Sequence, residues 1–154
     1  SKNGTELLQG DALPVLVREL LPLAYLVTPN IPEAEVLTGT AIHSVGDMEN
    51  ACRTLHAMGC RAVVVKGGHL AGNAVDVLFD GKKLYYFKSQ RLRTKHTHGT
   101  GCTFSAAITA YLAKGFGLIE SVKHAKTFVT AAIGKSLKIG QGQGPVNPLH
   151  ALKF

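Results

Sequence analysis

The sequence lacks any apolar run of the roughly 18 residues that a membrane-spanning helix needs. Its opening residues, Ser1-Lys2-Asn3-Gly4, also lack the apolar core of a secretory signal peptide. Three cysteines are an odd number, and their positions match no metal-ligand spacing. These absences favour a cytoplasmic protein with reduced thiols and no membrane partner.

Acidic residues are scarce relative to basic ones, with 10 against 17, so the formal charge is +7. The basic residues are scattered, and no stripe of them is interleaved with aromatic residues, as nucleic-acid binding would favour. A positive charge suits anionic partners in general, and phosphate-bearing small molecules fit it at least as well as nucleic acid. The 45% of apolar residues in 154 positions predicts one globular domain.

Two common phosphate-binding motifs are absent. Gly134-Lys135-Ser136 has the ending of a P-loop, but Val129 stands where its first glycine is required. Gly99 and Gly101 begin a dinucleotide fingerprint, but Phe104 replaces its third glycine. A nucleotide bound by this chain is therefore held by neither motif.

The apolar periodicities and turn residues predict an α/β fold with several strands and helices on both faces of the sheet. Asp11 and Asp47 are expected N-caps, and Gly39 and Gly59 are expected to end helices. The expected helices cover residues 11–21, 33–37, 47–58, 102–114 and 121–137. The expected strands cover residues 25–27, 62–65, 74–79 and 83–88, with a hairpin turn at Asp80-Gly81 and a parallel pairing of the first two.

The segment His98 to Phe104 is the most informative part of the chain. Gly99, Thr100 and Gly101 open a predicted helix, where free backbone N–H groups and the helix dipole bind anions, above all phosphate. Cys102 falls in the first turn, where a thiolate is stabilised and can take a proton from a substrate hydroxyl. The alternative is a helix N-terminus whose small residues serve only close packing.

Polar residues follow two of the predicted strands, and ligands of open α/β sheets lie beyond such carboxyl ends. Asn30 and Glu33 offer hard oxygen ligands for Mg²⁺, or else they cap the turn between the two neighbouring prolines. Lys66 can face a phosphate, or be a surface lysine at the end of a strand. If the strands are neighbours, these residues converge near the Gly99 turn. His96 and His98 would share a face of a strand, but no third metal ligand is evident.

Three segments together resemble the hydroxymethylpyrimidine/phosphomethylpyrimidine kinases of thiamine biosynthesis, which belong to the ribokinase-like superfamily. They are Leu26-Val27-Thr28-Pro29-Asn30-Ile31-Pro32-Glu33-Ala34-Glu35, Val64-Val65-Lys66-Gly67-Gly68-His69 and His98-Gly99-Thr100-Gly101-Cys102-Thr103-Phe104-Ser105. Their order and intervals make the resemblance specific, and it covers nearly the whole chain.

The resemblance implies a three-layer α/β/α fold and an ATP- and Mg²⁺-dependent kinase. Such enzymes phosphorylate 4-amino-5-hydroxymethyl-2-methylpyrimidine and then its monophosphate. Cys102 takes the place of the aspartate base that most ribokinase-like kinases have, after the anion hole of Gly99, Thr100 and Gly101. Asn30 and Glu33 correspond to the element linked to Mg²⁺ and phosphate.

The resemblance also implies that Lys66 approaches the ATP phosphates and that Lys126 lies on a helix near the adenine. A glycine- and serine-rich segment that binds the pyrimidine in such enzymes has no counterpart in this chain. We therefore expect residues 1–154 to be the C-terminal, nucleotide-binding portion of a longer kinase that forms a homodimer. Two alternatives are a pyridoxal kinase of the same superfamily and a non-catalytic nucleotide-binding fragment.

Overall fold

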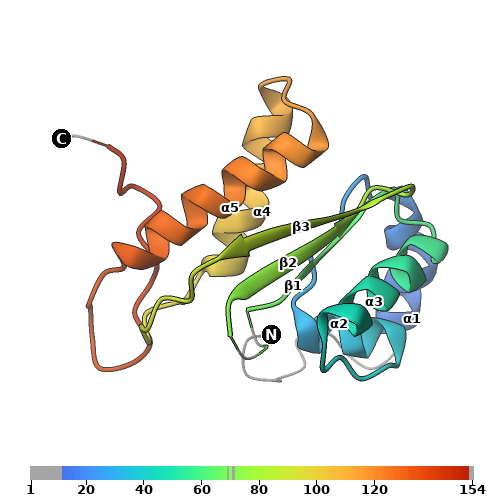
Figure 1. Ribbon diagram of the computed structural model, residues 1–154, viewed down its shortest axis with the longest axis horizontal. Coiled ribbons are helices and arrows are strands. Elements are labelled where there is room, and N and C mark those ends of the chain that lie inside the picture. Colours follow the sequence, from blue (N-terminus) through green and yellow to red (C-terminus); the bar gives the residue numbers. More distant parts are fainter. Residues whose placement is uncertain (1–11, 69, 71, 153–154) are drawn as a thin grey trace. The chain divides into compact units, whose positions relative to one another are not determined.

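The computed structural model describes residues 12–68, 70 and 72–152 (Figure 1). The chain divides into two compact units, residues 1–88 and residues 89–154. In the part of the chain that is described, no helix combines the length and apolar character needed to cross a bilayer.

From residue 12 on, the first unit has three short helical pieces instead of the single helix predicted for residues 11–21. They are an α-helix, α1 (Ala12–Val15), a π-helix, η1 (Leu16–Leu20), and a 3₁₀-helix, η2 (Leu21–Leu23). Pro22 lies in the first turn of η2, and because proline lacks an N–H it cannot extend the preceding helix. The predicted cap Asp11 lies outside the described residues.

The strand predicted for residues 25–27 is absent, but its parallel pairing is present. Val27 and Asn30 form isolated parallel bridges with Val63 and Lys66. The N–H of Val27 donates to the Ala62 carbonyl at 3.2 Å, and that of Lys66 donates to the Pro29 carbonyl at 2.9 Å. Pro29 has no N–H to donate, so the segment cannot continue as a regular strand.

Two helices of the first unit, α2 (Ile31–Thr38) and α3 (Val45–Ala57), begin with capping boxes. The predicted end of α2 is confirmed, since Gly39 has a left-handed φ of 69°. The prediction that Asp47 is the N-cap of α3 is wrong, because the N-cap is Ser44. Ser44 Oγ accepts the Asp47 N–H at 3.1 Å, and Asp47 Oδ2 accepts the Ser44 N–H at 2.9 Å. Asp47 is therefore the acidic partner of the box, three residues into the helix.

The capping box of α3 makes stability depend on pH. Hydrogen bonds from the His43 backbone and the Ser44 side chain lower the pKa of Asp47. A depressed folded-state pKa contributes stability above the unfolded-state value of about 4, and this contribution is lost as the pH falls through the folded-state pKa. We expect Asp47→Asn to lower the free energy of unfolding near neutral pH, and the difference from the unmodified protein to vanish near pH 2. Urea unfolding at both pH values measures it, and a difference that stays constant would contradict it.

The sheet of the first unit has the order β1 (Val63–Lys66), β2 (Ala74–Phe79), β3 (Leu84–Ser89). β1 and β2 are antiparallel, and Asp80 closes the β2–β3 turn by accepting the Lys82 and Lys83 N–H groups at 2.8 and 2.7 Å. Both α2 and α3 pack on the sheet (Figure 1). The core residues of α3 recur at helical spacing: Met48, Ala51, Cys52 and Leu55. They pack with buried side chains of β1 and β2: Val63, Val65, Val77 and Phe79.

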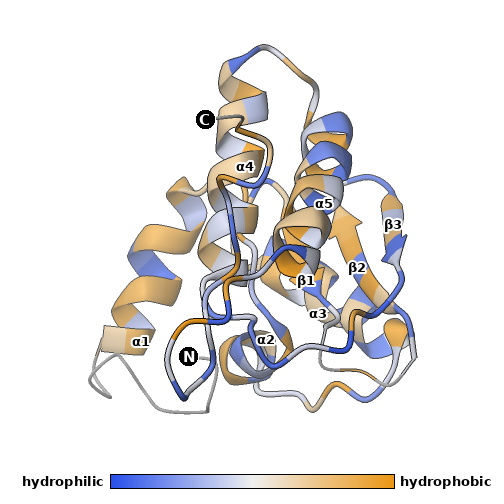
Figure 2. Ribbon diagram, turned by 90° about the vertical axis from the view of Figure 1, so that its left-hand side faces the viewer, coloured by the Kyte–Doolittle hydropathy of each residue, from blue (hydrophilic) through white to orange (hydrophobic). Residues whose placement is uncertain are grey.

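The second unit contains two helices packed against each other, α4 (Thr100–Ala113) and α5 (Leu118–Gly134), which begin two and three residues earlier than predicted. Gly99, with a φ of 82°, and Gly117 precede them and set these starts. Phe104 and Ile108 of α4 and Val122 and Ala125 of α5 are buried. Figure 2 shows both apolar and polar residues along α5, as expected of a helix buried along one face.

Candidate functional site

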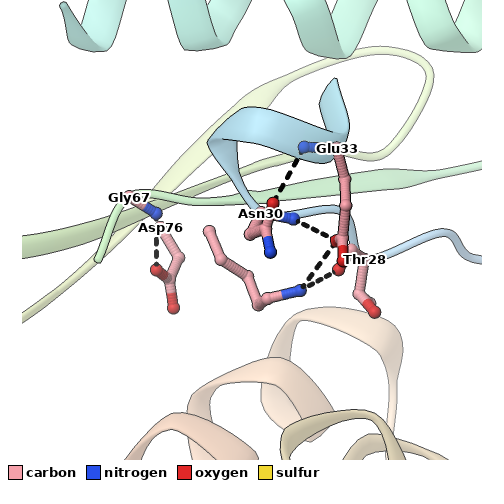
Figure 3. Close-up of polar contacts among 6 residues, drawn as sticks. Thr28, Asn30, Glu33, Gly67 and Asp76 are labelled. Carbon is pink, nitrogen blue, oxygen red and sulfur yellow. Dashed lines mark hydrogen bonds and ion pairs between the residues drawn. The ribbon is translucent and has the colours of Figure 1, made fainter. Parts of the chain in front are cut away.

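Asn30 and Glu33 lie at the start of α2, and they cap it. Asn30 Oδ1 accepts the Glu33 N–H at 2.8 Å, and Glu33 Oε2 accepts the Asn30 N–H at 2.8 Å (Figure 3). The sequence analysis offered local capping as the alternative to Mg²⁺ binding for these two residues, and the structure shows that they do cap the helix. A carboxylate has about four lone-pair sites, so Glu33 retains acceptor capacity beyond this bond.

Lys66 ends β1 beside these two residues, so the two predicted carboxyl ends lie together. Their predicted convergence near the Gly99 turn stays a prediction. Its ammonium group donates to the Thr28 carbonyl and lies 3.9 Å from Glu33 Oε2. The Lys66 side chain is only 18% exposed, whereas that of Glu33 is 41% exposed. Lys66 is thus a half-buried cation, which excludes the alternative of a freely solvated surface lysine. We refer to Thr28, Asn30, Glu33 and Lys66 as the strand-end cluster.

Two further residues lie beside the strand-end cluster: Asp76, which the sequence analysis missed, and Gly67, to which it gave no role. Asp76 is buried at 5% exposure, and its Oδ1 accepts the Gly67 N–H at 3.1 Å (Figure 3). A Cβ atom on Gly67 would lie 2.0 Å from the Val75 carbonyl oxygen, so only glycine fits there. One signal could have revealed Asp76: it is a charged residue within the strand predicted for residues 74–79. A charged residue that is buried in a strand nearly always has a partner.

The Gly99 turn opens α4 as predicted. Gly99 has a left-handed φ of 82°, and its carbonyl accepts the Thr103 N–H at 2.9 Å. Thr100 Oγ1 donates to the Thr97 carbonyl at 2.7 Å, which ties the first residue of the helix to the preceding loop. Gly101 and Cys102 follow as the second and third helical residues. The N–H groups of these positions have no acceptor within their own helix, so they are suited to an anion.

A second segment of the chain holds the Gly99 turn in place. The His98 N–H donates to the Gly144 carbonyl at 3.2 Å, and the Val146 N–H donates to the His98 carbonyl at 2.9 Å. The Gly144 N–H donates to Nδ1 of the buried His96 at 2.9 Å. A Cβ atom on Gly144 would lie 2.6 Å from that nitrogen, so the contact requires glycine.

The His96 and His98 pair does not form the shared face considered in the sequence. His96 is buried against Gly144, whereas His98 is exposed. The segment is irregular and not a strand, so alternate residues need not point the same way. Within residues 12–68, 70 and 72–152, no group of three potential His, Cys, Asp or Glu metal ligands occurs.

Cys102 is exposed, and it lines an open, mostly apolar hollow of about 560 Å³ on the α4–α5 pair. Tyr111, Lys114, Phe128 and Pro148 contribute to the same hollow. The thiol is therefore accessible to a ligand or reagent from solvent. Lys126, the residue predicted to lie near adenine, is buried at 8% exposure on α5.

The three thiols are expected to differ sharply in reactivity. Burial raises the pKa of the Cys52 thiol to about 12 and also raises that of Cys60. At pH 8 only about one Cys52 in ten thousand is then a thiolate, the form that reacts with iodoacetamide. We expect one alkylation per folded chain, at Cys102, and three after unfolding in urea, as measured by peptide mass spectrometry. Cys102→Ala is the control and should take no label when folded. Labelling of Cys52 as fast as Cys102 would contradict the assignment.

The family model and the curated relatives agree on one family. The family model described as phosphomethylpyrimidine kinase matches residues 1–147. The thiamine biosynthesis bifunctional protein ThiED of Geobacter sulfurreducens is 52% identical over 98% of this chain and 31% of its own length. The hydroxymethylpyrimidine/phosphomethylpyrimidine kinase of Haemophilus influenzae is 48% identical over 96% of this chain and 56% of its own length.

A solved structure gives the same picture of the fold. The ADP complex of Bacillus subtilis pyridoxal kinase superposes with a TM-score of 0.89 at 41% identity, over 94% of this chain and 57% of that chain. The predicted α/β class and ribokinase-like fold are confirmed by such neighbours. The chain spans a little over half the length of the Haemophilus influenzae and Bacillus subtilis proteins, and about a third of the bifunctional one.

Proposed function

Because the chain belongs to the phosphomethylpyrimidine kinase family, we propose that it is the C-terminal, nucleotide-binding portion of an ATP-dependent kinase. Its substrates would be 4-amino-5-hydroxymethyl-2-methylpyrimidine and the monophosphate of that compound. The observation that carries the proposal is the Gly99 turn, which presents the start of α4 and an exposed Cys102 thiol together.

We assign the predicted residues separate tasks in phosphoryl transfer. Gly99, Thr100 and Gly101 form the anion hole, where backbone N–H groups stabilise charge on the moving phosphoryl group. Cys102 accepts the proton of the substrate hydroxyl as that oxygen attacks. These roles need only positioned groups, because phosphoryl transfer asks for little covalent chemistry from the protein.

Four further residues would bind the nucleotide and its metal ion: Lys66, Lys126, Asn30 and Glu33. Lys66 supplies a half-buried positive charge to the ATP phosphates. Lys126 lies on a helix next to the adenine. Asn30 and Glu33 fit Mg²⁺ through bridging waters, because their oxygens are hard ligands and the Glu33 carboxylate is partly exposed. When bound, Mg²⁺ neutralises part of the phosphate charge.

The test is phosphorylation by the full-length protein that carries these residues, which we expect to be a cytoplasmic homodimer. The hydroxymethylpyrimidine and its monophosphate are each incubated with MgATP and followed by mass spectrometry. We expect the hydroxymethylpyrimidine to gain two phosphates in succession and its monophosphate to gain one. Each gain should require Mg²⁺. No gain on either compound would overturn the proposal.

Pyridoxal kinase activity is the second candidate, because a pyridoxal kinase superposes so well on this chain. The same assay with pyridoxal separates the two, by comparing kcat/KM for the two compounds. A higher kcat/KM for pyridoxal would replace the first proposal with the second. MgATP binding measured by calorimetry, with no turnover on any of these compounds, would favour a non-catalytic nucleotide-binding fragment.

A further inference from the structure

Asp76 is a buried carboxylate to which the proposed function gives no task. It lies on β2 with 5% of its surface exposed. Burying a carboxylate is costly unless it accepts hydrogen bonds and lies near a positive charge. The residues around Asp76 in the first unit therefore indicate its role.

One hydrogen-bond partner of Asp76 is Gly67, the residue that follows Lys66. Asp76 Oδ1 accepts the Gly67 N–H at 3.1 Å, in a buried setting. Gly67 also approaches the Val75 carbonyl so closely that a Cβ atom would lie 2.0 Å from it. Two residues of β2 therefore constrain the backbone just after Lys66: Asp76 through its hydrogen bond, and Val75 through the close approach of its carbonyl.

Asp76 lies across the strand pair from Lys66, whose ammonium group donates to the Thr28 carbonyl and lies 3.9 Å from Glu33 Oε2. Asp76 and Lys66 are directly opposed in the antiparallel register of β1 and β2. Directly opposed residues place their side chains on the same face, with Cβ atoms about 4.5–5.5 Å apart. Figure 3 shows the Asp76 carboxyl group on the same side of the strands as the side chains of Asn30 and Glu33.

We propose that Asp76 is a positioning residue for Lys66. It fixes the backbone at the end of β1 through Gly67, and its negative charge, with that of Glu33, holds the ammonium group at the strand-end cluster. A lysine side chain loses rotamer entropy when it is fixed in one conformation. Holding it before ATP arrives moves that cost from nucleotide binding to folding. This inference rests on the proposed function, in which Lys66 contacts the ATP phosphates.

The experiment is a double-mutant cycle on Asp76 and Lys66 in the full-length protein. We expect Asp76→Ala to lower kcat/KM for ATP about tenfold, and less than twofold when Lys66 is already alanine. Asp76→Asn keeps an oxygen for the Gly67 N–H but removes the charge, so its loss should be intermediate. A purely structural role would give the same loss in both backgrounds, and that result would overturn the proposal.

Asp80, which directly follows β2, offers a matched control. Its carboxylate also accepts backbone N–H groups, those of Lys82 and Lys83, but at the opposite end of β2. Asp80→Ala should lower stability and leave kcat/KM for ATP within twofold of the unmodified value. An equal loss of kcat/KM in Asp80→Ala and Asp76→Ala would show that any weakened turn of this sheet has the same effect.

A second measurement needs no catalysis, and it separates this inference from the proposed function. The NMR order parameter of the Lys66 side chain should fall below about 0.6 in Asp76→Ala and stay unchanged in Asp80→Ala. If Lys66→Ala leaves KM for ATP unchanged, the nucleotide role of Lys66 fails while the order parameter still tests Asp76. An unchanged order parameter in Asp76→Ala would overturn the positioning role, whatever the kinase assay gives.

Discussion

Replacing Cys102 with alanine should lower kcat for both phosphorylations by about 10²–10⁴-fold, the usual contribution of a positioned general base. The folded structure should be unaffected, because the side chain is exposed. Steady-state kinetics of the full-length protein measures kcat, and urea unfolding checks that the free energy of unfolding is unchanged. KM for ATP should change little, since the thiol is assigned to the hydroxyl of the other substrate.

Two variants make the test of Cys102 specific. Cys102→Asp should recover part of the lost kcat. The resemblance to ribokinase-like kinases implies that most of them have an aspartate as the base at this place. Thr109→Ala, an exposed position on the same helix, should leave kcat unchanged. A fall in kcat of less than about threefold in Cys102→Ala would remove the thiol from the mechanism.

Replacing Gly67 with alanine should cost the fold at least about 3 kcal/mol of unfolding free energy, the upper range for overpacking. The new methyl group would meet the Val75 carbonyl oxygen at 2.0 Å and the Met48 methyl group at 3.0 Å. The first of these is backbone of the adjacent strand, which cannot move without breaking the β1–β2 pairing. Because Lys66 is the preceding residue, kcat/KM for ATP should fall as well.

Gly68 is the matched control for this prediction. A Cβ atom on Gly68 would meet nothing within 4 Å, and the residue is exposed. Gly68→Ala should therefore change the free energy of unfolding by less than about 0.5 kcal/mol. Urea unfolding of both variants makes the comparison, and similar losses would contradict the steric argument for Gly67.

Local chemistry explains why much of the fold could be predicted. Gly39 and Gly59 end helices as expected, because each adopts a positive φ that other residues disfavour. The valine run of β1 is a strand because β-branched side chains suit a pleated, buried surface. The errors are also local: Ser44 and Asp47 are both good caps, and only the folded backbone shows which of the two precedes the first helical turn.

The site was predicted in part for a similar reason. Asn30, Glu33 and Lys66 follow segments that pair in parallel, so their proximity follows from topology. The contacts of Asp76 with Gly67 and of Gly144 with His96 join residues 9 and 48 positions apart. No spacing rule predicts such contacts, because they depend on strand register and loop path.

The sequence by itself determined the family, the helices and strands from α2 to α5, and the Gly99 turn with Cys102 after it. Each of these depends on residues close together in the chain, whose backbone preferences and motifs are local. The tertiary structure alone decided that Asn30 and Glu33 cap α2, that Lys66 is half-buried, and that Asp76 and His96 hold the neighbouring backbone. Burial and hydrogen-bond partners of polar side chains are set by which distant segments meet, and that is decided only when the core packs.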